Sequence, residues 1–380
     1  MKIGRFGKRY VAINNAVLFL ALIFMLGCKK QEVNHPKTDT MVLVFMAANN
    51  DLKADAIDCI NKMEAGYNGN KKLLVFIKTS DEKSFILKIK KDNTNEIVSD
   101  TIYIFGAENT SDPEFVSAVI LKSRSLLPAD NYGIILWSHA SSWAPPLNSF
   151  KTKSFGYDSG VEMDIIDLKN ALPNDFAFII FDACSMGSIE ALYELKDNAR
   201  YLIASPTAVL SNSYPYENIL PHLFGNLNDL KLVAQKFVAY YKQFDGLYAS
   251  ATITVIDAKE LKNFADKVKN LTMHYPPVSG YNAEQIQRFD YDSKDRVNAY
   301  DFLSYLENNY QASQYKEVSD QLSKVVLFKD NTEYFLGNSI KIFSGISVYL
   351  PLIDDPMLYY YKDLQWYNDS GWKKLFSPTN

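Results

Sequence analysis

The sequence has little net charge and no strongly basic stretch. Its 380 residues carry a formal net charge of −4, and no stripe of Lys and Arg side chains repeats along a helical pattern. A protein that binds the phosphate backbone of a nucleic acid needs such a basic surface. The sequence therefore argues against nucleic acid as a partner.

The chain also lacks the short motifs of several enzyme classes. It has no His-Glu-x-x-His segment, which binds zinc in many metallopeptidases, and no Gly-Lys-Ser/Thr phosphate-binding loop. Its most acidic segment, residues 290–295, has a lysine among the acids and lacks the glycine and closing glutamate of an EF-hand loop. The sequence therefore predicts no cofactor and no specific metal site.

Long apolar runs are few, and the run at the amino terminus has the pattern of an export signal. Basic residues precede an apolar stretch over residues 16–26, which is short for a bilayer span. The Gly27-Cys28 that follows resembles the end of a bacterial lipoprotein signal, in which the cysteine becomes the lipidated amino terminus; an uncleaved anchor is the alternative. We expect a signal peptide over residues 1–28, a polar tether over 29–40, and a cell-envelope location with Cys28 anchored in a bacterial membrane, facing the periplasm or the surface.

Strand-like and helix-like segments alternate along most of the remaining chain. This alternation is typical of an α/β domain with a mostly parallel, doubly wound sheet, and we assign that domain to residues 41–272. The pattern changes after this point, and residues 273–380 are predicted to form a C-terminal subdomain. There we expect helices over 299–310 and 315–327 and a strand over 340–350. A long surface loop is expected over residues 142–162, where proline and glycine interrupt any period.

A buried strand over residues 176–181 ends in Asp182-Ala183-Cys184, and small residues and a helical run follow. This pattern places Cys184 at the carboxyl end of a parallel strand, where open α/β sheets bind ligands. A helix beginning near Ser185 would direct backbone N–H groups at the sulfur and favour the thiolate. The alternative is a buried cysteine with a structural role only.

A second buried strand ends in a histidine. The apolar run over residues 134–137 leads directly into Ser138-His139, again followed by small polar residues. A single histidine at a strand end is more often a structural hydrogen-bonding group. A cysteine and a histidine delivered in the same way by two strands, however, suit a nucleophile and its acid–base partner.

At these residues the chain resembles the clostripain family of cysteine peptidases, relatives of caspases, legumains and gingipains. The resemblance is carried by SHASSW around His139 and by FDACSMGSIEALYEL around Cys184. The Asp-Ala-Cys block is specific, and four other segments give support: residues 45–52, 201–206, 214–216 and 345–351. The similarity extends from about Met41 to the carboxyl terminus.

The resemblance implies a caspase-like α/β fold: a three-layer sandwich with a mostly parallel central sheet, helices on both faces and a C-terminal subdomain. It also implies an endopeptidase that cuts peptide or protein substrates after Arg or Lys. Cys184 would be the nucleophile and His139 the general acid and base. Backbone N–H groups of Ala140 and Cys184 would stabilise the oxyanion.

Asp182 lies two residues before the proposed nucleophile, so its carboxylate is expected to reach the same cleft. In the family, the acidic residue at this place lines the pocket for Arg or Lys, where it would form a charge-assisted hydrogen bond with the substrate side chain. The alternative is that Asp182 only caps the helix that follows.

The sequence departs from the family pattern near the proposed site. Ala140 and Ser142 stand where glycines are common, and Ala140 would be strained if its position required a positive φ. The segment 208–213 also lacks the usual acidic residue. Ala140 and Ser142 leave open one alternative to a peptidase, a catalytically silent, caspase-like lipoprotein that binds peptides or partners. A cysteine-dependent acyl or peptidyl transferase is a further alternative, because hydrolysis and transfer share the acyl-enzyme.

The third cysteine, Cys59, lies in a segment with helical spacing of apolar residues, which predicts a half-buried position. A disulfide between Cys59 and Cys184 would block the nucleophile in an oxidising compartment. Nothing in the sequence brings these two residues together, so we expect two separate thiols.

Overall fold

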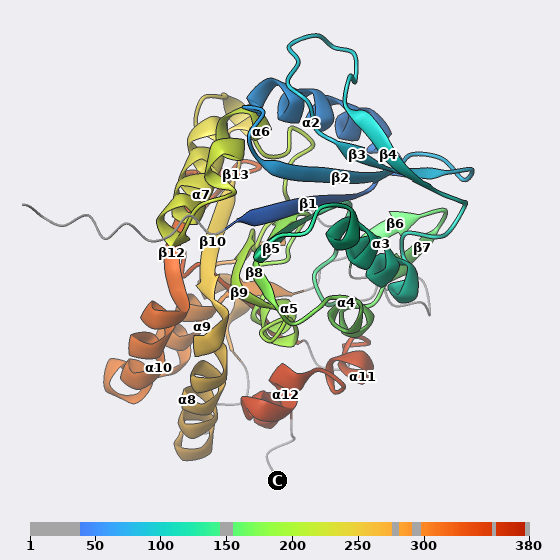
Figure 1. The fold of residues 1–380 in the computed structure, drawn as a ribbon. Coiled ribbons are helices and arrows are strands. Elements are labelled where there is room, and N and C mark those ends of the chain that lie inside the picture. Colours follow the sequence, from blue (N-terminus) through green and yellow to red (C-terminus); the bar gives the residue numbers. More distant parts are fainter. Residues whose placement is uncertain (1–38, 145–154, 276–280, 291–297, 352–354, 377–380) are drawn as a thin grey trace, which may run out of the picture. The chain divides into compact units, whose positions relative to one another are not determined.

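The computed structural model describes residues 39–144, 155–275, 281–290, 298–351 and 355–376 (Figure 1). The predicted signal peptide, nearly all of the tether and Cys28 lie outside the described residues, as does most of the acidic segment 290–295. No helix in the described part of the chain has the length and apolar character needed to cross a membrane.

The fold is built on a nine-stranded sheet. Its five central strands are mutually parallel, as their continuous apolar sequences predict for strands buried on both faces. In spatial order these are β9 (Ala199–Ala204), β8 (Phe176–Asp182), β5 (Asn131–Trp137), β1 (Thr40–Ala47) and β2 (Lys72–Lys78). The carboxyl ends of these strands therefore meet at one edge of the sheet.

Both sides of the sheet are completed by antiparallel strands. β3 (Ser84–Lys88) and β4 (Asp100–Phe105) extend it beyond β2, and β10 (Thr252–Asp257) and β12 (Val326–Asn331) extend it beyond β9. The helix expected over 315–327 ends at Val325, because residues 326 and 327 are the first residues of β12. A short apolar run fits a helix end and a strand equally well, and here pairing with β10 decides.

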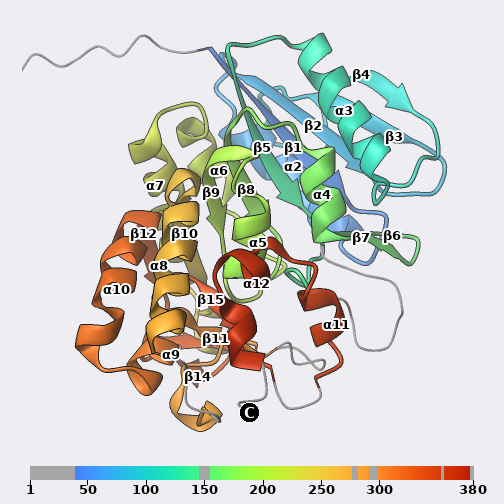
Figure 2. The ribbon, with the colours of Figure 1, turned by 90° about the horizontal axis from the view of Figure 1, so that it is seen from below.

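Helices cover both faces of the sheet, as Figures 1 and 2 show. Along β1, Leu43 and Phe45 point into one core, while Val42 and Val44 point into the other. The second core is covered by α2 (Lys53–Gly66), α6 (Tyr216–Ile219) and α7 (Leu227–Tyr241). The first is covered by α3 (Pro113–Leu126), α4 (Ile165–Ala171), α5 (Ile189–Glu194) and α8 (Leu261–His274). The expected α/β sandwich is confirmed.

The carboxyl-terminal elements pack on the first core (Figure 2). The elements that contribute residues to it are β11 (Ala299–Asp301), α9 (Phe302–Asn309), α10 (Ala312–Val325), β15 (Ser347–Tyr349), α11 (Leu358–Tyr361) and α12 (Gln365–Asp369). β13 (Tyr334–Phe335) pairs with β14 (Asn338–Ser339) and contributes Phe335 to a separate small cluster. The expected helix over 299–310 thus begins with a strand that pairs with β15. The strand expected over 340–350 is confined to β15. The domain boundary at residue 272 stays a prediction.

Residues 155–163 form a hairpin instead of part of the expected surface loop. Its strands are β6 (Phe155–Asp158) and β7 (Val161–Met163), and Phe155 and Asp158 are buried. The glycines of this segment are in the left-handed region, at φ 75° for Gly156 and 84° for Gly160. The glycines that predict an irregular loop therefore allow the backbone of a hairpin instead.

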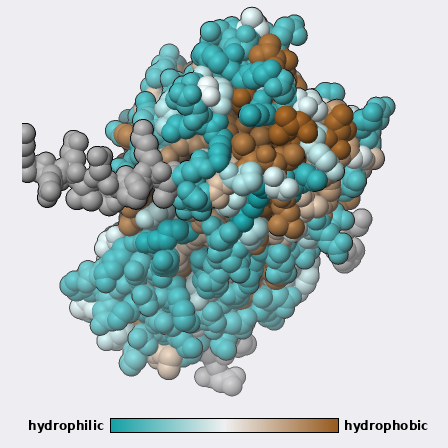
Figure 3. All heavy atoms as spheres, in the orientation of Figure 1, coloured by the Kyte–Doolittle hydropathy of each residue, from teal (hydrophilic) through white to brown (hydrophobic). Residues whose placement is uncertain are grey.

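The surface is polar over most of the face seen in Figure 3, with apolar residues gathered over the β2–β4 side of the sheet. Ile104 on the edge strand β4 is 54% exposed, and Val98 just before this strand is also exposed. The polar covering is most continuous over the carboxyl-terminal helices.

Candidate active site

His139 and Cys184 lie at the same edge of the sheet. Trp137 at the end of β5 is paired with Asp182 at the end of β8, and His139 and Cys184 each follow two positions after their member of this pair. Both line one cleft of about 270 Å³, together with Asp182. The opposite wall comes from the segment after β9, with Val209, Leu210, Ser211 and Ser213. Parallel pairing of two neighbouring strands is the reason that the two residues meet.

Cys184 lies in a turn, and the expected helix start at Ser185 is wrong. α5 begins at Ile189 and is capped by the hydroxyl of Ser188, which accepts a hydrogen bond from the N–H of Ala191 (3.2 Å). The N–H of Ser185 instead donates to the carbonyl of Thr207 (2.9 Å). The start of α5 is therefore too distant in the chain to hold the thiolate in the way predicted, and Asp182 is not its cap.

The turn after Cys184 is pressed against the segment that follows β9. The N–H of Gly187 donates to the carbonyl of Ser205 (2.8 Å), and a Cβ at this glycine would lie 2.5 Å from the nitrogen of Pro206. Only glycine permits this approach. The Cys184 Sγ is 3.7 Å from the carbonyl of Val209, and the Cys184 side chain packs against a small buried cluster of Ala208, Phe289, Phe335 and Ile340.

His139 contacts a residue that the sequence analysis did not assign to the site. Its Nε2 lies 2.8 Å from Oδ1 of Asp51, which follows β1. The hydrogen bond from His139 holds the pKa of the Asp51 carboxyl below its ordinary value. The signal that pointed to it is topological: β1 pairs with β5, so a turn after β1 reaches the same edge.

Asp182 is buried, and its carboxylate is held by protein groups. The hydroxyl of Tyr216 donates to Oδ2 (2.8 Å), and so does the hydroxyl of Ser213. Trp137 Nε1 in turn donates to Ser213 Oγ (3.2 Å). Burial raises the pKa of Asp182 to about 6, although these hydrogen bonds oppose the shift.

The residues that replace family glycines have different roles. Ala140 forms an antiparallel bridge with Phe155 and is not among the residues of positive φ, whereas Ser142 has φ 66°. The condition for strain at Ala140 is therefore not met, and Ser142 takes the left-handed conformation. Its hydroxyl lies 2.6 Å from the hydroxyl of Ser188, which ties the histidine loop to the helix that follows Cys184.

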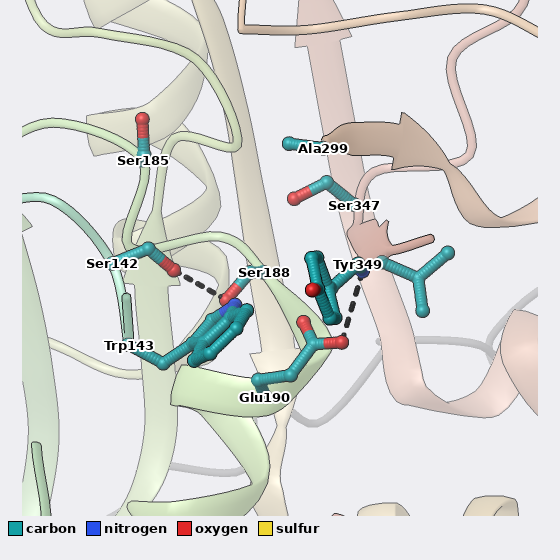
Figure 4. A pocket seen from close by; sticks show the side chains of 9 residues that line it. Ser142, Trp143, Ser185, Ser188, Glu190, Ala299, Ser347 and Tyr349 are labelled. Atoms are coloured by element: carbon teal, nitrogen blue, oxygen red, sulfur yellow. Dashed lines mark hydrogen bonds between the residues drawn. The ribbon is translucent and has the colours of Figure 1, made fainter. Parts of the chain in front are cut away.

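A small pocket behind this contact joins the loops to the carboxyl-terminal strand β15 (Figure 4). The Oε1 of the buried Glu190 accepts from the N–H of Tyr349 and from the hydroxyl of Tyr361, both at 2.9 Å. Burial raises the pKa of Glu190 to about 7. The ring of Trp143 lies 4.8 Å from the rings of both tyrosines. These contacts fix the loop that carries His139.

Cys59 is buried in α2, and no disulfide links it to Cys184. Burial raises the pKa of the Cys59 thiol to about 12. The chemistry open to a thiol near the cleft therefore rests with Cys184, which is partly exposed.

Comparisons with known proteins agree on one family. The model of the clostripain family matches residues 44–377. A solved structure of a secreted C11 cysteine protease from Bacteroides thetaiotaomicron, in complex with an irreversible peptide inhibitor, is 26% identical, has a TM-score of 0.76 and covers 88% of this chain and 99% of its own. An inactive zymogen C11 protease from Parabacteroides distasonis is 28% identical, also with a TM-score of 0.76, over 89% of this chain and 99% of its own. No curated protein matches the chain.

Proposed function

Because the chain belongs to the clostripain family of cysteine peptidases, we propose that it hydrolyses peptide bonds after Arg or Lys with Cys184 and His139 as a catalytic pair. The single observation that carries this proposal is the cleft that both side chains line, at the ends of paired parallel strands. A nucleophile and a base at one strand edge form the arrangement needed for acyl transfer.

In the proposed reaction the Cys184 thiolate attacks the carbonyl carbon of the scissile bond. The N–H groups of Ala140 and Cys184 donate to the oxyanion that forms. The C–N bond then breaks as the protonated His139 gives its proton to the leaving amine, and an acyl-enzyme remains. Water gives a proton to His139 and attacks the acyl carbon, and the C–S bond breaks to release the acid.

Asp182, which lines the cleft, is proposed to determine the preference for substrates with Arg or Lys before the scissile bond. A substrate cation placed against this buried carboxylate would form a charge-assisted pair. Such a cation also favours the ionised carboxylate, and so lowers a pKa that burial has raised to about 6. In the absence of substrate, the same carboxylate accepts hydrogen bonds from Ser213, which also lines the cleft, and from the fully buried Tyr216.

The location is proposed from the amino-terminal sequence. A lipid on Cys28 would anchor the protein to a bacterial envelope membrane. The support comes from the lipoprotein-like signal in the sequence and from a relative described as secreted. Labelling of cells with a radioactive fatty acid, compared between the native chain and Cys28→Ala, tests the anchor.

Hydrolysis of fluorogenic peptides with Arg, Lys, Asp or Leu before the cut tests the activity. Cys184→Ala and His139→Ala should each lower kcat/KM by about a thousandfold or more, whereas Cys59→Ala, which removes the other thiol of the described chain, should not. Asp182→Asn keeps an acceptor for Ser213 and Tyr216 but loses the charge. It should lower kcat/KM for Arg and Lys peptides by about a hundredfold.

The pH dependence gives a second readout of the Asp182 pocket. KM for Arg peptides should rise as pH falls through about 6, because the carboxyl then takes up a proton and loses its charge. Equal loss of all four peptides in Asp182→Asn would contradict the pocket and leave the catalytic pair intact. A folded, reduced protein that turns over no peptide would favour the binding-only alternative.

A further inference from the structure

The carboxylate of Asp51 contacts Nε2 of His139, the proposed acid–base residue. Asp51 Oδ1 lies 2.8 Å from Nε2 of His139. The Asp51 side chain is 80% exposed and that of His139 is 38% exposed, so this contact lies at the mouth of the cleft. Exposed ion pairs contribute little to stability, which makes a purely stabilising role for this pair a weak explanation.

The turn that carries Asp51 is itself held in place. Asn50 Nδ2 donates to the carbonyl of Ala47 (3.0 Å) at the end of β1 and to the carbonyl of Tyr157 (2.7 Å) in the hairpin. Asn50 Oδ1 accepts from the N–H of Leu52 (2.9 Å). The turn that carries Asp51 is therefore held by hydrogen bonds between the Asn50 side chain and backbone groups of β1, the hairpin and Leu52. These contacts keep Asp51 in position beside the imidazole of His139.

We propose that Asp51 is a positioning residue that keeps the proton of neutral His139 on Nε2 and presents Nδ1 to Cys184. This inference rests on the proposed role of His139 as acid and base. An ionised carboxylate can only accept a hydrogen bond, so the nitrogen facing it must carry the proton. The Cys184 thiol then passes its proton to Nδ1, and the resulting imidazolium gives that proton to the leaving amine.

The exposure of Asp51 bounds the size of the effect. In solvent, its charge stabilises the imidazolium only modestly, so the main contribution is the choice of nitrogen and the orientation of the ring. Other ionisable groups on the imidazole's side of the cleft are Cys184, Asp182 and Tyr157, whose ring lies edge-on at 6.3 Å from the His139 ring. The variants used to test Asp51 must therefore leave these three residues unchanged, so that a change in the pH–rate profile can be assigned to the contact between Asp51 and His139.

The first test reads the tautomer without reference to turnover. Protein labelled with ¹⁵N-histidine is examined by long-range ¹H–¹⁵N correlation at a pH where His139 is neutral, with His139→Ala to assign its signals. The native protein should show the Nε2–H form, and Asp51→Ala should shift the population towards Nδ1–H. An Nδ1–H form in the native protein, or an unchanged tautomer in Asp51→Ala, would overturn the proposal.

The second test is kinetic. Asp51→Ala should lower kcat by about tenfold to a hundredfold with little change in KM and move the acidic limb of the pH–rate profile. Asp51→Asn should recover part of the loss, because its amide oxygen can still accept from Nε2. Asp58→Asn removes an exposed carboxylate on α2, the helix that follows the Asp51 turn, where it is paired with Lys62. It should leave both quantities unchanged.

The two tests also separate this inference from the proposed function. If the chain hydrolyses peptides and Asp51→Ala matches the native kcat and pH profile, the positioning role is wrong while the catalytic pair stands. If the Nε2–H tautomer depends on Asp51 but Cys184→Ala keeps full activity, the contact is real and the proposed mechanism fails.

Discussion

Three serines in the loops that carry the cleft residues have backbones in the left-handed region, which usually favours glycine. Ser142 (φ 66°), Ser185 (φ 60°) and Ser213 (φ 61°) lie in the loops after β5, β8 and β9. Each such residue costs on the order of 1 kcal/mol or more unless its surroundings compensate. Two of the side chains do so, since Ser142 Oγ contacts Ser188 and Ser213 Oγ donates to Asp182. The geometry of the cleft is thus partly maintained by side-chain hydrogen bonds.

Ser142 gives a prediction at this scale. Ser142→Ala loses the contact with Ser188 and keeps a Cβ in the left-handed region, whereas Ser142→Gly loses the contact and the strain together. The glycine variant should therefore be the more stable of the two, by about 1 kcal/mol in the free energy of unfolding. Urea denaturation of both variants measures it, and an alanine variant equal to or better than glycine would show that Ser142 is not strained.

The β6–β7 hairpin shows how a buried charge fixes one element. Asp158 Oδ2 accepts from Lys78 Nζ (2.7 Å) and from the N–H of Thr110 (2.7 Å), and Oδ1 accepts from Asn49 (2.7 Å). Burial opposes ionisation of this carboxyl, but the hydrogen bonds from Lys78 and its other partners outweigh it and hold the pKa of Asp158 below its ordinary value. The hairpin is thereby fastened to β2 and to the turn before Asp51.

Removing both partners of this pair should cost less than the sum of the two single removals. Asp158→Asn leaves the buried Lys78 ammonium without its counter-charge and should lower the free energy of unfolding by about 3 kcal/mol. In Lys78→Met combined with Asp158→Asn, the loss should be smaller than the sum of the two single losses. A double-mutant cycle by chemical denaturation checks the coupling, and strictly additive losses would mean that the pair does not interact.

Across the whole molecule, Glu190 links the helix after Cys184 to the carboxyl-terminal elements. It accepts hydrogen bonds from Tyr349 in β15 and Tyr361 in α11. Burial raises its pKa to about 7, from an ordinary value of 4.5. In the folded state this acid therefore keeps its proton at a pH where the unfolded chain has already lost it.

The raised pKa of Glu190 makes the free energy of unfolding fall as the pH rises. The stabilising contribution is fully present below about pH 4.5 and is lost as the pH rises through about 7, because only the unfolded state is ionised in between. Glu190→Gln cannot ionise, so its stability relative to the native chain should improve from pH 5 to pH 8, by on the order of 2 kcal/mol. Urea unfolding at both pH values measures this.

The control for this prediction is Glu307→Gln, which changes an exposed glutamate on α9. It should leave the pH dependence of unfolding as it is in the native chain. If the Glu190→Gln difference is the same at pH 5 and pH 8, the pKa of this carboxyl is not raised in the folded protein.

Local patterns in the sequence were sufficient to predict the layered fold and the two strands that lead to His139 and Cys184. Continuous apolar runs such as residues 176–181 can be satisfied only by burial on both faces, and the helices between them require parallel neighbours. These predictions rest on the spacing of apolar residues and on the turn residues between segments. Both can be recognised without knowing which segments pack together. The family resemblance agreed with them, and the match over residues 44–377 confirms the family.

The features that depend on partners far apart in the sequence could not be predicted from local patterns. Asp51 meets His139 across 88 positions of sequence, and Asp158 meets Lys78 across 80. Residues 326–331 form the strand β12 because they pair with β10. α5 begins only at Ile189 because the N–H groups of Ser185 and Gly187 donate hydrogen bonds to the segment after β9. Each outcome is set by hydrogen bonds and ion pairs between segments that no local pattern brings together, and their free energy arises only once the chain is folded.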